Sequence, residues 1–313
     1  MSTGAVAYLF PGQGSQHPGM GRSLARKFPE SRKVFDEADR VLGRPLSSLC
    51  FDGTDEELKL TENTQPSILT ASVAALRVLE AKGLRPVAAA GHSLGEYTAL
   101  VAAGTLSFAD ALRSVELRGR FMQEAVPVGQ GAMAAILGLS TPLVTEICRS
   151  AAADQVVSPA NLNGPSQVVI SGHAGAVERA MEQARSAGAR RAVPLPVSAP
   201  FHCSLMAPAA ERLRPVLESV EFRDSSFAVY TNVDAAPAAS GAAARDSLLR
   251  QVTAPVRWQE SVEAMIAAGV ETFVEVGPGK VLSGLLRGIR RGTRVYQAGA
   301  AEGIESTLEE LAA

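Results

Sequence analysis

Short apolar stretches alternate with longer amphipathic ones through most of the chain. A short apolar stretch bounded by turn residues is typical of a buried strand, whereas apolar residues that recur every three or four positions indicate a helix. The expected strands are residues 5–10, 87–90, 227–231, 272–276 and 294–297, and the expected helices are 23–42, 66–82, 96–103, 108–125, 258–268 and 281–289. Strands that alternate with helices predict a parallel sheet covered by helices, which is an α/β fold.

The pattern changes in the middle of the chain. Strands are expected at residues 132–137, 156–162, 167–171 and 192–195, and helices at 141–153 and 174–187. This β-α-β-β-α-β order is the ferredoxin-like unit, which covers one face of its own antiparallel sheet. We therefore expect a small subdomain at residues 130–198, inserted into a large domain made of residues 1–129 and 199–313. Residues 234–244, rich in Ala and Pro, are expected to form a mobile loop.

Charge and cysteine content exclude several classes of protein. The 313 residues carry 30 basic and 32 acidic side chains, which leaves no dense cationic surface for nucleic acid or an anionic membrane. The three cysteines stand alone in the sequence, so we expect neither a disulfide scaffold nor a metal site, and a reducing cytoplasm is the expected compartment. The apolar N-terminal run has no basic residues before it and is expected to be a strand, not a signal peptide. No apolar stretch is long enough to predict a membrane span.

The sequence Gly91-His-Ser-Leu-Gly95 fits a nucleophile elbow, in which a serine sits on a sharp turn between a strand and a helix. Both flanking elements are expected here. The turn would project Ser93 outward, and the backbone N–H of Leu94 at the start of the helix would face a developing oxyanion. The alternative is a glycine-rich turn whose serine only caps the helix.

A serine nucleophile needs a base, and His202 is the first candidate among four histidines. It lies where the chain returns from the small subdomain to the large domain, and clefts form at such junctions. His92 is expected to point away from the serine, His173 to lie in solvent, and His17 to be a possible lining residue. No acidic residue near His202 obviously completes a triad, but a backbone carbonyl can also fix a histidine tautomer, so a Ser-His dyad is chemically sound.

Two further polar residues fit a binding site. Gln13 follows the first strand in a glycine-rich loop that lacks the third glycine of a dinucleotide-binding motif, and it would help to shape an oxyanion hole or lie in water. Arg118 falls at the edge of a helix's apolar stripe, where a permanent cation must find an anion. Its partner would be an internal carboxylate, solvent, or the carboxylate of a substrate.

Taken together, the motifs resemble those of the malonyl-CoA:acyl carrier protein transacylases and the related polyketide synthase acyltransferases. The resemblance covers nearly the whole chain. It rests on Phe10-Pro-Gly-Gln-Gly-Ser-Gln16, Thr64-Gln-Pro66, Gly91-His-Ser-Leu-Gly-Glu96, Arg118-Gly-Arg-Phe-Met-Gln123, Gly131-Ala-Met-Ala-Ala135, Asn163-Gly-Pro-Ser-Gln167, Phe201-His202, Pro255-Val-Arg-Trp258 and Glu275-Val-Gly-Pro-Gly279, in that order.

The resemblance implies an α/β-hydrolase-like large domain and a role for each matching residue. Ser93 would carry the acyl group, His202 would be the base, and Gln13 with Leu94 would hold the oxyanion. Arg118 would bind the malonyl carboxylate, Phe201 before the histidine would favour malonyl over methylmalonyl groups, and the backbone carbonyl of Gln251 would orient the histidine. No bound cofactor is implied, because coenzyme A belongs to the substrate and phosphopantetheine to the acceptor.

The expected activity is malonyl transfer from malonyl-CoA to an acyl carrier protein, in fatty acid or polyketide synthesis. A carrier protein is usually acidic, so a basic patch of Lys280, Arg287, Arg290 and Arg291, with Arg294 nearby, is a candidate docking surface; the alternative is a solvated helix face. The competing functions are a serine hydrolase or thioesterase, which would use water as the acceptor, and a docking module without catalysis. The broken glycine pattern disfavours a dinucleotide-binding oxidoreductase.

Overall fold

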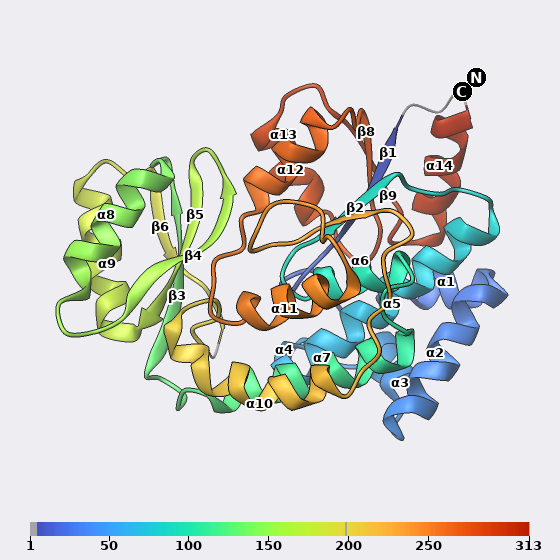
Figure 1. The fold of residues 1–313 in the computed structure, drawn as a ribbon, viewed down its shortest axis with the longest axis horizontal. Coiled ribbons are helices and arrows are strands. Elements are labelled where there is room, and N and C mark those ends of the chain that lie inside the picture. Colours follow the sequence, from blue (N-terminus) through green and yellow to red (C-terminus); the bar gives the residue numbers. More distant parts are fainter. Residues whose placement is uncertain (1–4, 198, 313) are drawn as a thin grey trace.

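The computed structural model describes residues 5–197 and 199–312, and its larger unit is built on a parallel sheet of five strands (Figure 1). The strand order is β7-β2-β1-β8-β9. The central strand β1 (Val6–Phe10) pairs with β2 (Ala88–Gly91) on one side and β8 (Thr272–Glu275) on the other, and β7 (Ala228–Tyr230) and β9 (Arg294–Gln297) form the edges. The carboxyl ends of adjacent strands therefore meet at one edge of the sheet, where α/β proteins bind their ligands.

Helices cover both faces of this sheet, and the side chains of β1 divide between the two resulting cores. Tyr8 and Phe10 pack into a core with α5, α6 and α7, whereas Ala7 and Leu9 pack into a second core with α12 and α13. A strand buried on both faces needs apolar residues at every position, which explains the unbroken apolar run at the N-terminus. The helices of this unit are α1 (Arg22–Lys27), α2 (Pro29–Leu42), α3 (Leu46–Asp52), α4 (Asp55–Lys59), α5 (Thr61–Ala81), α6 (Gly95–Ala102), α7 (Phe108–Glu124), α10 (Ala207–Glu218), α11 (Gly241–Gln251), α12 (Trp258–Ala267), α13 (Val281–Ile289) and α14 (Ala301–Ala312), with a short 3-10 turn at Ser204–Met206.

The smaller unit is a four-stranded antiparallel sheet with two helices on one face, and it lies to the left in Figure 1. Its strand order, β4-β5-β3-β6, is that of the ferredoxin-like unit. The elements are β3 (Gly131–Leu137), α8 (Thr141–Ala152), β4 (Val157–Gly164), β5 (Gln167–His173), α9 (Ala174–Ser186) and β6 (Arg191–Pro194). The helices and one face of the sheet enclose a separate core. The predicted α/β class, with a parallel sheet and an inserted antiparallel one, is confirmed.

The opposite face of the small sheet packs on the large unit. Met133, Ala160 and Val169 belong to the same apolar core as the helices of the large domain. A backbone bridge also joins the two units, because Val256 N donates to Ala160 O at 2.8 Å and Leu162 N donates to Val256 O at 2.8 Å. Apolar packing and backbone hydrogen bonds together fix the position of β4 beside the segment that follows α11.

Several predicted boundaries were wrong. The single helix expected at 23–42 is two helices, because Phe28 is extended (φ −121°, ψ 118°), as the residue before Pro29 tends to be. The expected loop at 234–244 ends earlier, since α11 begins at Gly241, where the Ser240 side chain accepts a hydrogen bond from Ala243 N. The helix expected from Pro66 begins at Thr61. Helices α3, α4, α10, α11 and α14 were not predicted at all.

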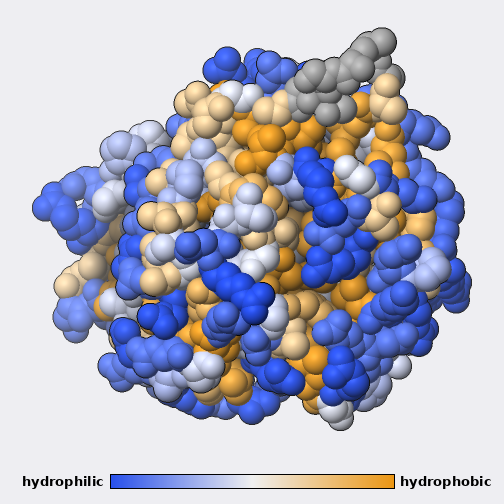
Figure 2. Space-filling model, turned by 45° about the vertical axis from the view of Figure 1, so that its right-hand side comes forward, coloured by the Kyte–Doolittle hydropathy of each residue, from blue (hydrophilic) through white to orange (hydrophobic). Residues whose placement is uncertain are grey.

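The surface is mixed in character. Figure 2 shows hydrophilic residues around the rim of the visible face and hydrophobic ones exposed mainly in its middle, between the hydrophilic groups. Within the described residues, no helix has both the length and the apolar character that a membrane span requires.

Candidate functional site

The turn between β2 and α6 has the geometry of a nucleophile elbow. Ser93 adopts a left-handed backbone conformation, with φ of 52°, which is strained for a residue with a side chain. The flanking glycines leave no room for substitution: a Cβ on Gly91 would lie 1.8 Å from the carbonyl carbon of Gly95, and a Cβ on Gly95 would lie 2.1 Å from Phe10 O. The close approach of backbone to backbone is therefore what requires glycine at both positions.

Ser93 is paired with a histidine whose orientation is fixed by a backbone carbonyl. The Oγ atom of Ser93 lies 2.7 Å from Nε2 of His202, and Nδ1 of His202 lies 2.8 Å from the carbonyl oxygen of Gln251. Because a carbonyl only accepts, Nδ1 carries the proton and donates it to Gln251 O, which leaves Nε2 free to accept from the serine hydroxyl. This is the tautomer that a general base needs.

The environment keeps His202 neutral. Its side chain is buried, and burial together with the charge of Arg118 lowers the pKa of His202 from its ordinary 6.5 to about 3. The backbone at His202 is left-handed, with φ of 60°, so the base, like the nucleophile, sits on a strained turn. Neutral imidazole next to an un-ionised serine is the resting state of a Ser-His dyad.

Arg118 is buried beside the serine with no carboxylate to pair with. Its guanidinium donates from Nη1 to Gln65 Oε1 at 2.8 Å, and from Nη2 to Gln251 Oε1 at 2.9 Å and to Ser93 Oγ at 3.1 Å. The side chain is 1% exposed, its Nε atom has no hydrogen-bond partner, and it forms no ion pair in the part of the chain that the structure describes. The internal salt bridge and the exposed position that the sequence left open are both absent there. A buried cation that has only neutral hydrogen-bond partners is energetically costly, and an anion bound beside it would lower that cost.

The two residues predicted as oxyanion donors, Leu94 and Gln13, lie on the elbow and on the loop beside it. The Ser93 N–H is already occupied, because it donates to Asn232 Oδ1 at 2.7 Å, but the Leu94 N–H has no acceptor within the described residues. Gln13 stands on the loop after β1, which is pressed against the elbow so closely that a Cβ on Gly12 would lie 2.3 Å from His92 O. Gln13 lines the same cleft as Ser93, and the Leu94 N–H, next to Ser93 at the start of α6, is left without an acceptor among the described residues.

Ser93, His202, Arg118 and Gln13 all line one cleft between the two units, with a volume of about 440 Å³. The cleft is within the range of small-molecule sites. The large unit contributes the elbow, the dyad, Arg118, Gln13, Phe201 and the start of α13, and the small unit contributes side chains of β3, β4 and β5. The residues that the two units bring together here include Gln13, Gln65, His92, Ser93, Arg118, Met133, Asn161, Asn163, Val169, Phe201, His202, Val281 and Leu285.

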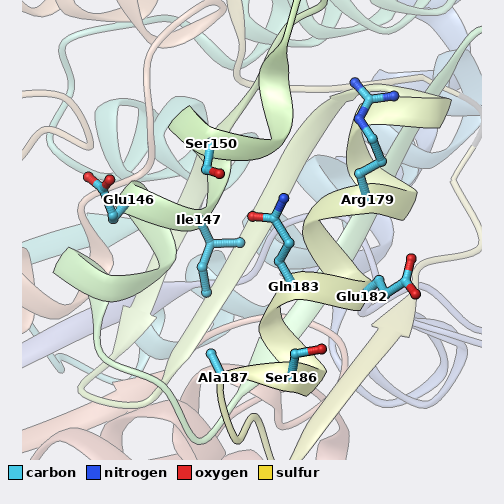
Figure 3. A pocket seen from close by; sticks show the side chains of 8 residues that line it. All are labelled: Glu146, Ile147, Ser150, Arg179, Glu182, Gln183, Ser186 and Ala187. Carbon is cyan, nitrogen blue, oxygen red and sulfur yellow. The ribbon is translucent and has the colours of Figure 1, made fainter.

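A larger hollow of about 770 Å³ lies between α8 and α9 on the outer side of the small unit (Figure 3). Its lining includes Glu146, Arg179, Glu182 and Gln183, none of which forms a nucleophile-base pair. The hollow is open and lies on the opposite side of the small sheet from the core shared with the large unit. Chemistry therefore places the site in the smaller cleft.

The remaining histidines take no part in the dyad. His92 turns its ring toward the small unit, where Nε2 lies 2.9 Å from Asn163 Oδ1, and its ring packs against Trp258. His17 is exposed and does not line the cleft. The expectation that His173 lies in solvent was wrong. His173 is the last residue of β5 and is half-buried, and its Nδ1 accepts a hydrogen bond from Val156 N.

Two residues that hold the site together were missed. Asn232, just after β7, accepts from Ser93 N and donates from Nδ2 to Gly91 O at 2.7 Å, so it holds both sides of the elbow. Glu96, on the first turn of α6, is fully buried beneath it. The only sequence signal for Asn232 was its position at the carboxyl end of an expected strand next to the elbow.

The four basic residues of the candidate patch, Lys280, Arg287, Arg290 and Arg291, are exposed on and around α13. None of them forms an ion pair with a described residue, whereas Arg294 lies 3.7 Å from Glu271. The same helix lines the cleft through Val281, Leu282 and Leu285. The patch therefore borders one side of the cleft. No cluster of three or more potential metal ligands occurs among residues 5–197 and 199–312.

Comparison with known proteins gives consistent matches over the whole chain. Residues 7–305 match the acyl transferase domain family. The chain is 48% identical over 307 residues to the malonyl CoA-acyl carrier protein transacylase of Bacillus subtilis, covering 98% of this chain and 97% of that protein. It is 53% identical over 284 residues to the protein of the same name from Escherichia coli K12, covering 90% and 92%.

Solved structures agree with these sequence matches. The malonyl CoA-acyl carrier protein transacylase of Coxiella burnetii superimposes with a TM-score of 0.96 at 43% identity, covering 98% of each chain. A malonyl-transacylase solved in complex with a holo type II PKS acyl-carrier protein superimposes with a TM-score of 0.95 at 48% identity, covering 98% of this chain and 99% of that one.

Proposed function

The chain belongs to the acyl transferase domain family, as its motifs predicted, and from that premise we propose that it transfers a malonyl group from malonyl-CoA to the phosphopantetheine thiol of an acyl carrier protein. The observation that carries the choice of acyl group is Arg118, a buried guanidinium without a carboxylate partner among the described residues, whose Nη2 lies 3.1 Å from Ser93 Oγ. An acyl group on Ser93 that ends in a carboxylate would supply the missing anion.

The first half of the reaction loads the enzyme. Nε2 of His202 takes the proton of Ser93 while Oγ attacks the thioester carbonyl, and the Leu94 N–H and Gln13 stabilise the oxyanion that forms. When the tetrahedral intermediate collapses, the C–S bond breaks and His202 gives its proton to the departing coenzyme A thiolate. The malonyl group then remains as an ester of Ser93.

The second half transfers the group to the carrier protein. His202 takes the proton of the phosphopantetheine thiol, the thiolate attacks the malonyl ester, and the same donors hold the second oxyanion. Collapse returns the proton from His202 to Ser93 Oγ and releases the malonyl thioester of the carrier protein. The reaction is ping-pong and needs no further cofactor.

The pocket selects the acyl group by charge and by size. An acetyl group would leave Arg118 buried and unpaired, and a site built around a buried polar group discriminates strongly against a substrate that lacks the matching group. Phe201, 7% exposed, lines the cleft directly before His202 and limits the space for a branched acyl chain. The proposed preference is therefore for malonyl over acetyl and methylmalonyl groups.

The four exposed basic residues on and around α13 are the proposed docking surface for the carrier protein. These residues form no ion pair with a carboxylate among the described residues, so their charges are free to attract an acidic protein. Electrostatic attraction of this kind mainly raises the association rate. The double substitution Arg287→Glu and Arg290→Glu should raise the KM for carrier protein and leave loading by malonyl-CoA unchanged. Reversal of Lys33 and Arg40 on α2, away from α13 in Figure 1, is the control. An unchanged KM in the α13 variant would rule out this surface.

The function itself is tested by following the acyl group. Intact mass should rise by one malonyl group when the enzyme meets malonyl-CoA and fall back when holo carrier protein is added. Ser93→Ala should abolish the adduct, and Ser219→Ala, at an exposed serine on the end of α10, should not. Loss of the adduct to water faster than to carrier protein would favour a thioesterase, and absence of any adduct would favour a docking module.

The cysteines bear on the cellular setting. The three cysteines are buried and unpaired, which supports a reducing cytoplasm as the compartment. Carrier proteins of fatty acid synthesis and of polyketide synthesis present the same phosphopantetheine thiol, so the proposed site would serve either pathway.

A further inference from the structure

Glu96 is a carboxylate in an unusual place. It lies on α6 beneath the elbow, with no exposed surface, and no cation forms an ion pair with it in the described part of the chain. Its oxygens accept hydrogen bonds from Asn232 N at 2.9 Å, from Gln251 Nε2 at 2.7 Å and from Ser247 Oγ at 3.2 Å. A charge buried this deeply is costly unless something nearby compensates it.

The compensating charge is one side chain away. The carboxamide of Gln251 lies between Glu96 and Arg118: its nitrogen donates to Glu96 Oε2, and its oxygen accepts from Arg118 Nη2 at 2.9 Å. An ionised carboxylate only accepts and a guanidinium only donates, so the reversed amide would oppose like partners on both sides. The two charges thus fix the amide, and the amide dipole connects them.

We propose that Glu96 is the counter-charge of Arg118, acting through the side-chain amide of Gln251. This indirect pairing compensates the charge of Arg118 while the side of its guanidinium that faces the cleft stays open. Glu96 is in this view a positioning residue. The inference rests on the proposed malonyl transfer, because it concerns how Arg118 receives a substrate carboxylate. A carboxylate bonded directly to Arg118 would compete with the substrate for the same donors.

The local charges fit this arrangement. Burial raises the pKa of Glu96 to about 7, and the positive charge of Arg118 acts in the opposite direction, which is the sign expected for a pair that interacts. The other groups that meet Glu96, on the segment after β7 and on α11, are Asn232, Ser247 and Gln251, and none of them titrates. Its neighbour Tyr97 is buried, and burial raises the pKa of that phenol, so it stays neutral.

The test is Glu96→Gln, which removes the charge and keeps the size. The carbonyl of the new side chain can still accept from Asn232 and Gln251, and the amide nitrogen can face Ser247 Oγ. At pH 8, where Glu96 is ionised, the variant should bind the malonyl carboxylate more tightly, because Arg118 has lost its compensating charge. We expect the ratio of kcat/KM for malonyl-CoA to that for acetyl-CoA to rise on the order of tenfold, and the melting temperature of the free enzyme to fall.

The matched control is Glu275→Gln. Glu275 is also fully buried and accepts from Leu282 N, Ser283 N and Ser283 Oγ, but the cation whose charge acts on it is Arg287, not Arg118. This substitution should lower the melting temperature and leave the malonyl to acetyl ratio unchanged. A purely structural role for Glu96 would make the two variants alike.

A second measurement does not depend on activity. The free energy of unfolding is measured for Glu96→Gln, for Arg118→Met and for the double variant. The loss in the double variant should be clearly smaller than the sum of the losses in the two single variants, because the double variant leaves neither charge buried alone. Additive losses, or a malonyl to acetyl ratio in Glu96→Gln that is unchanged or lower, would overturn the inference. If the unsubstituted enzyme forms no malonyl adduct, the proposed function fails instead, while the stability cycle still tests the pairing.

Discussion

Replacement of Arg118 should change which acyl group the enzyme accepts more than it changes catalysis itself. In Arg118→Met the side chain keeps much of its volume but loses the guanidinium and its bonds to Gln65, Gln251 and Ser93. The malonyl carboxylate would lose a buried, charge-assisted contact, and the loss of one partner of such a pair costs about 2–5 kcal/mol. At about 1.36 kcal/mol for each factor of ten, kcat/KM for malonyl-CoA should fall by roughly 30-fold to 5,000-fold.

The assay is the rate of acyl-enzyme formation, measured by rapid quench with malonyl-CoA and acetyl-CoA in parallel. Acetyl transfer loses only the contact between Nη2 and Ser93 Oγ, so its rate should fall by less than about tenfold. Arg118→Lys, which keeps the charge but not the two-pronged donor geometry, should lie between the two for malonyl-CoA. Equal losses for both acyl groups would refute the reasoning, because they would assign Arg118 to the dyad and not to the substrate carboxylate.

Three further predictions concern the dyad, the elbow and the helix that carries Gln251. The pKa of His202 is lowered to about 3, so the base stays neutral in mild acid. Inactivation of Ser93 by an uncharged fluorophosphonate should therefore keep the same rate from pH 8 down to pH 5. A fall in that rate of about tenfold or more over this range would indicate a base with the ordinary pKa of 6.5. Gly91→Ala should lower the free energy of unfolding by about 3 kcal/mol and abolish acylation, because of the backbone contact at 1.8 Å, whereas Gly284→Ala, in open space on α13, should not destabilise the protein in chemical denaturation. Ser240→Ala removes the cap of α11 and should cost about 1 kcal/mol in the same measurement; no change in the unfolding midpoint would show that the cap is not what begins this helix.

The elbow could be predicted from the sequence because its causes are local. An apolar strand, two glycines around a serine, and an apolar helix follow each other within a few residues, and the steric demands at Gly91 and Gly95 arise from the same turn and the strand beside it. The strands of both units and the two helices of the small unit were predicted for the same reason, since hydrophobic periodicity is a property of neighbouring positions. The predictions failed where local signals conflict, as at α11, whose Ala-rich start follows a Pro-containing stretch.

The contacts around the dyad could not be predicted in this way. Asn232 reaches the elbow because β7 lies next to β2 in the sheet, which brings the ends of two strands together although Ser93 and Asn232 are 139 residues apart in the sequence. Gln251 reaches His202 from α11, a helix that the sequence did not indicate. The role of its carbonyl was inferred only from the family resemblance.

The sequence by itself determined the two units, the serine turn and a short set of polar candidates, because periodicity, glycine spacing and residue chemistry act over neighbouring positions. The tertiary structure alone decided which candidates meet: that Ser93 Oγ lies 2.7 Å from His202 Nε2, that Arg118 lies 1% exposed with no carboxylate partner among the described residues, and that Glu96 lies behind Gln251. The physical reason is that burial and the geometry of hydrogen bonds depend on strand order and helix packing. Strand order and helix packing bring together side chains from distant parts of the chain, and the spacing of residues along the sequence does not reveal which of these side chains lie close in space.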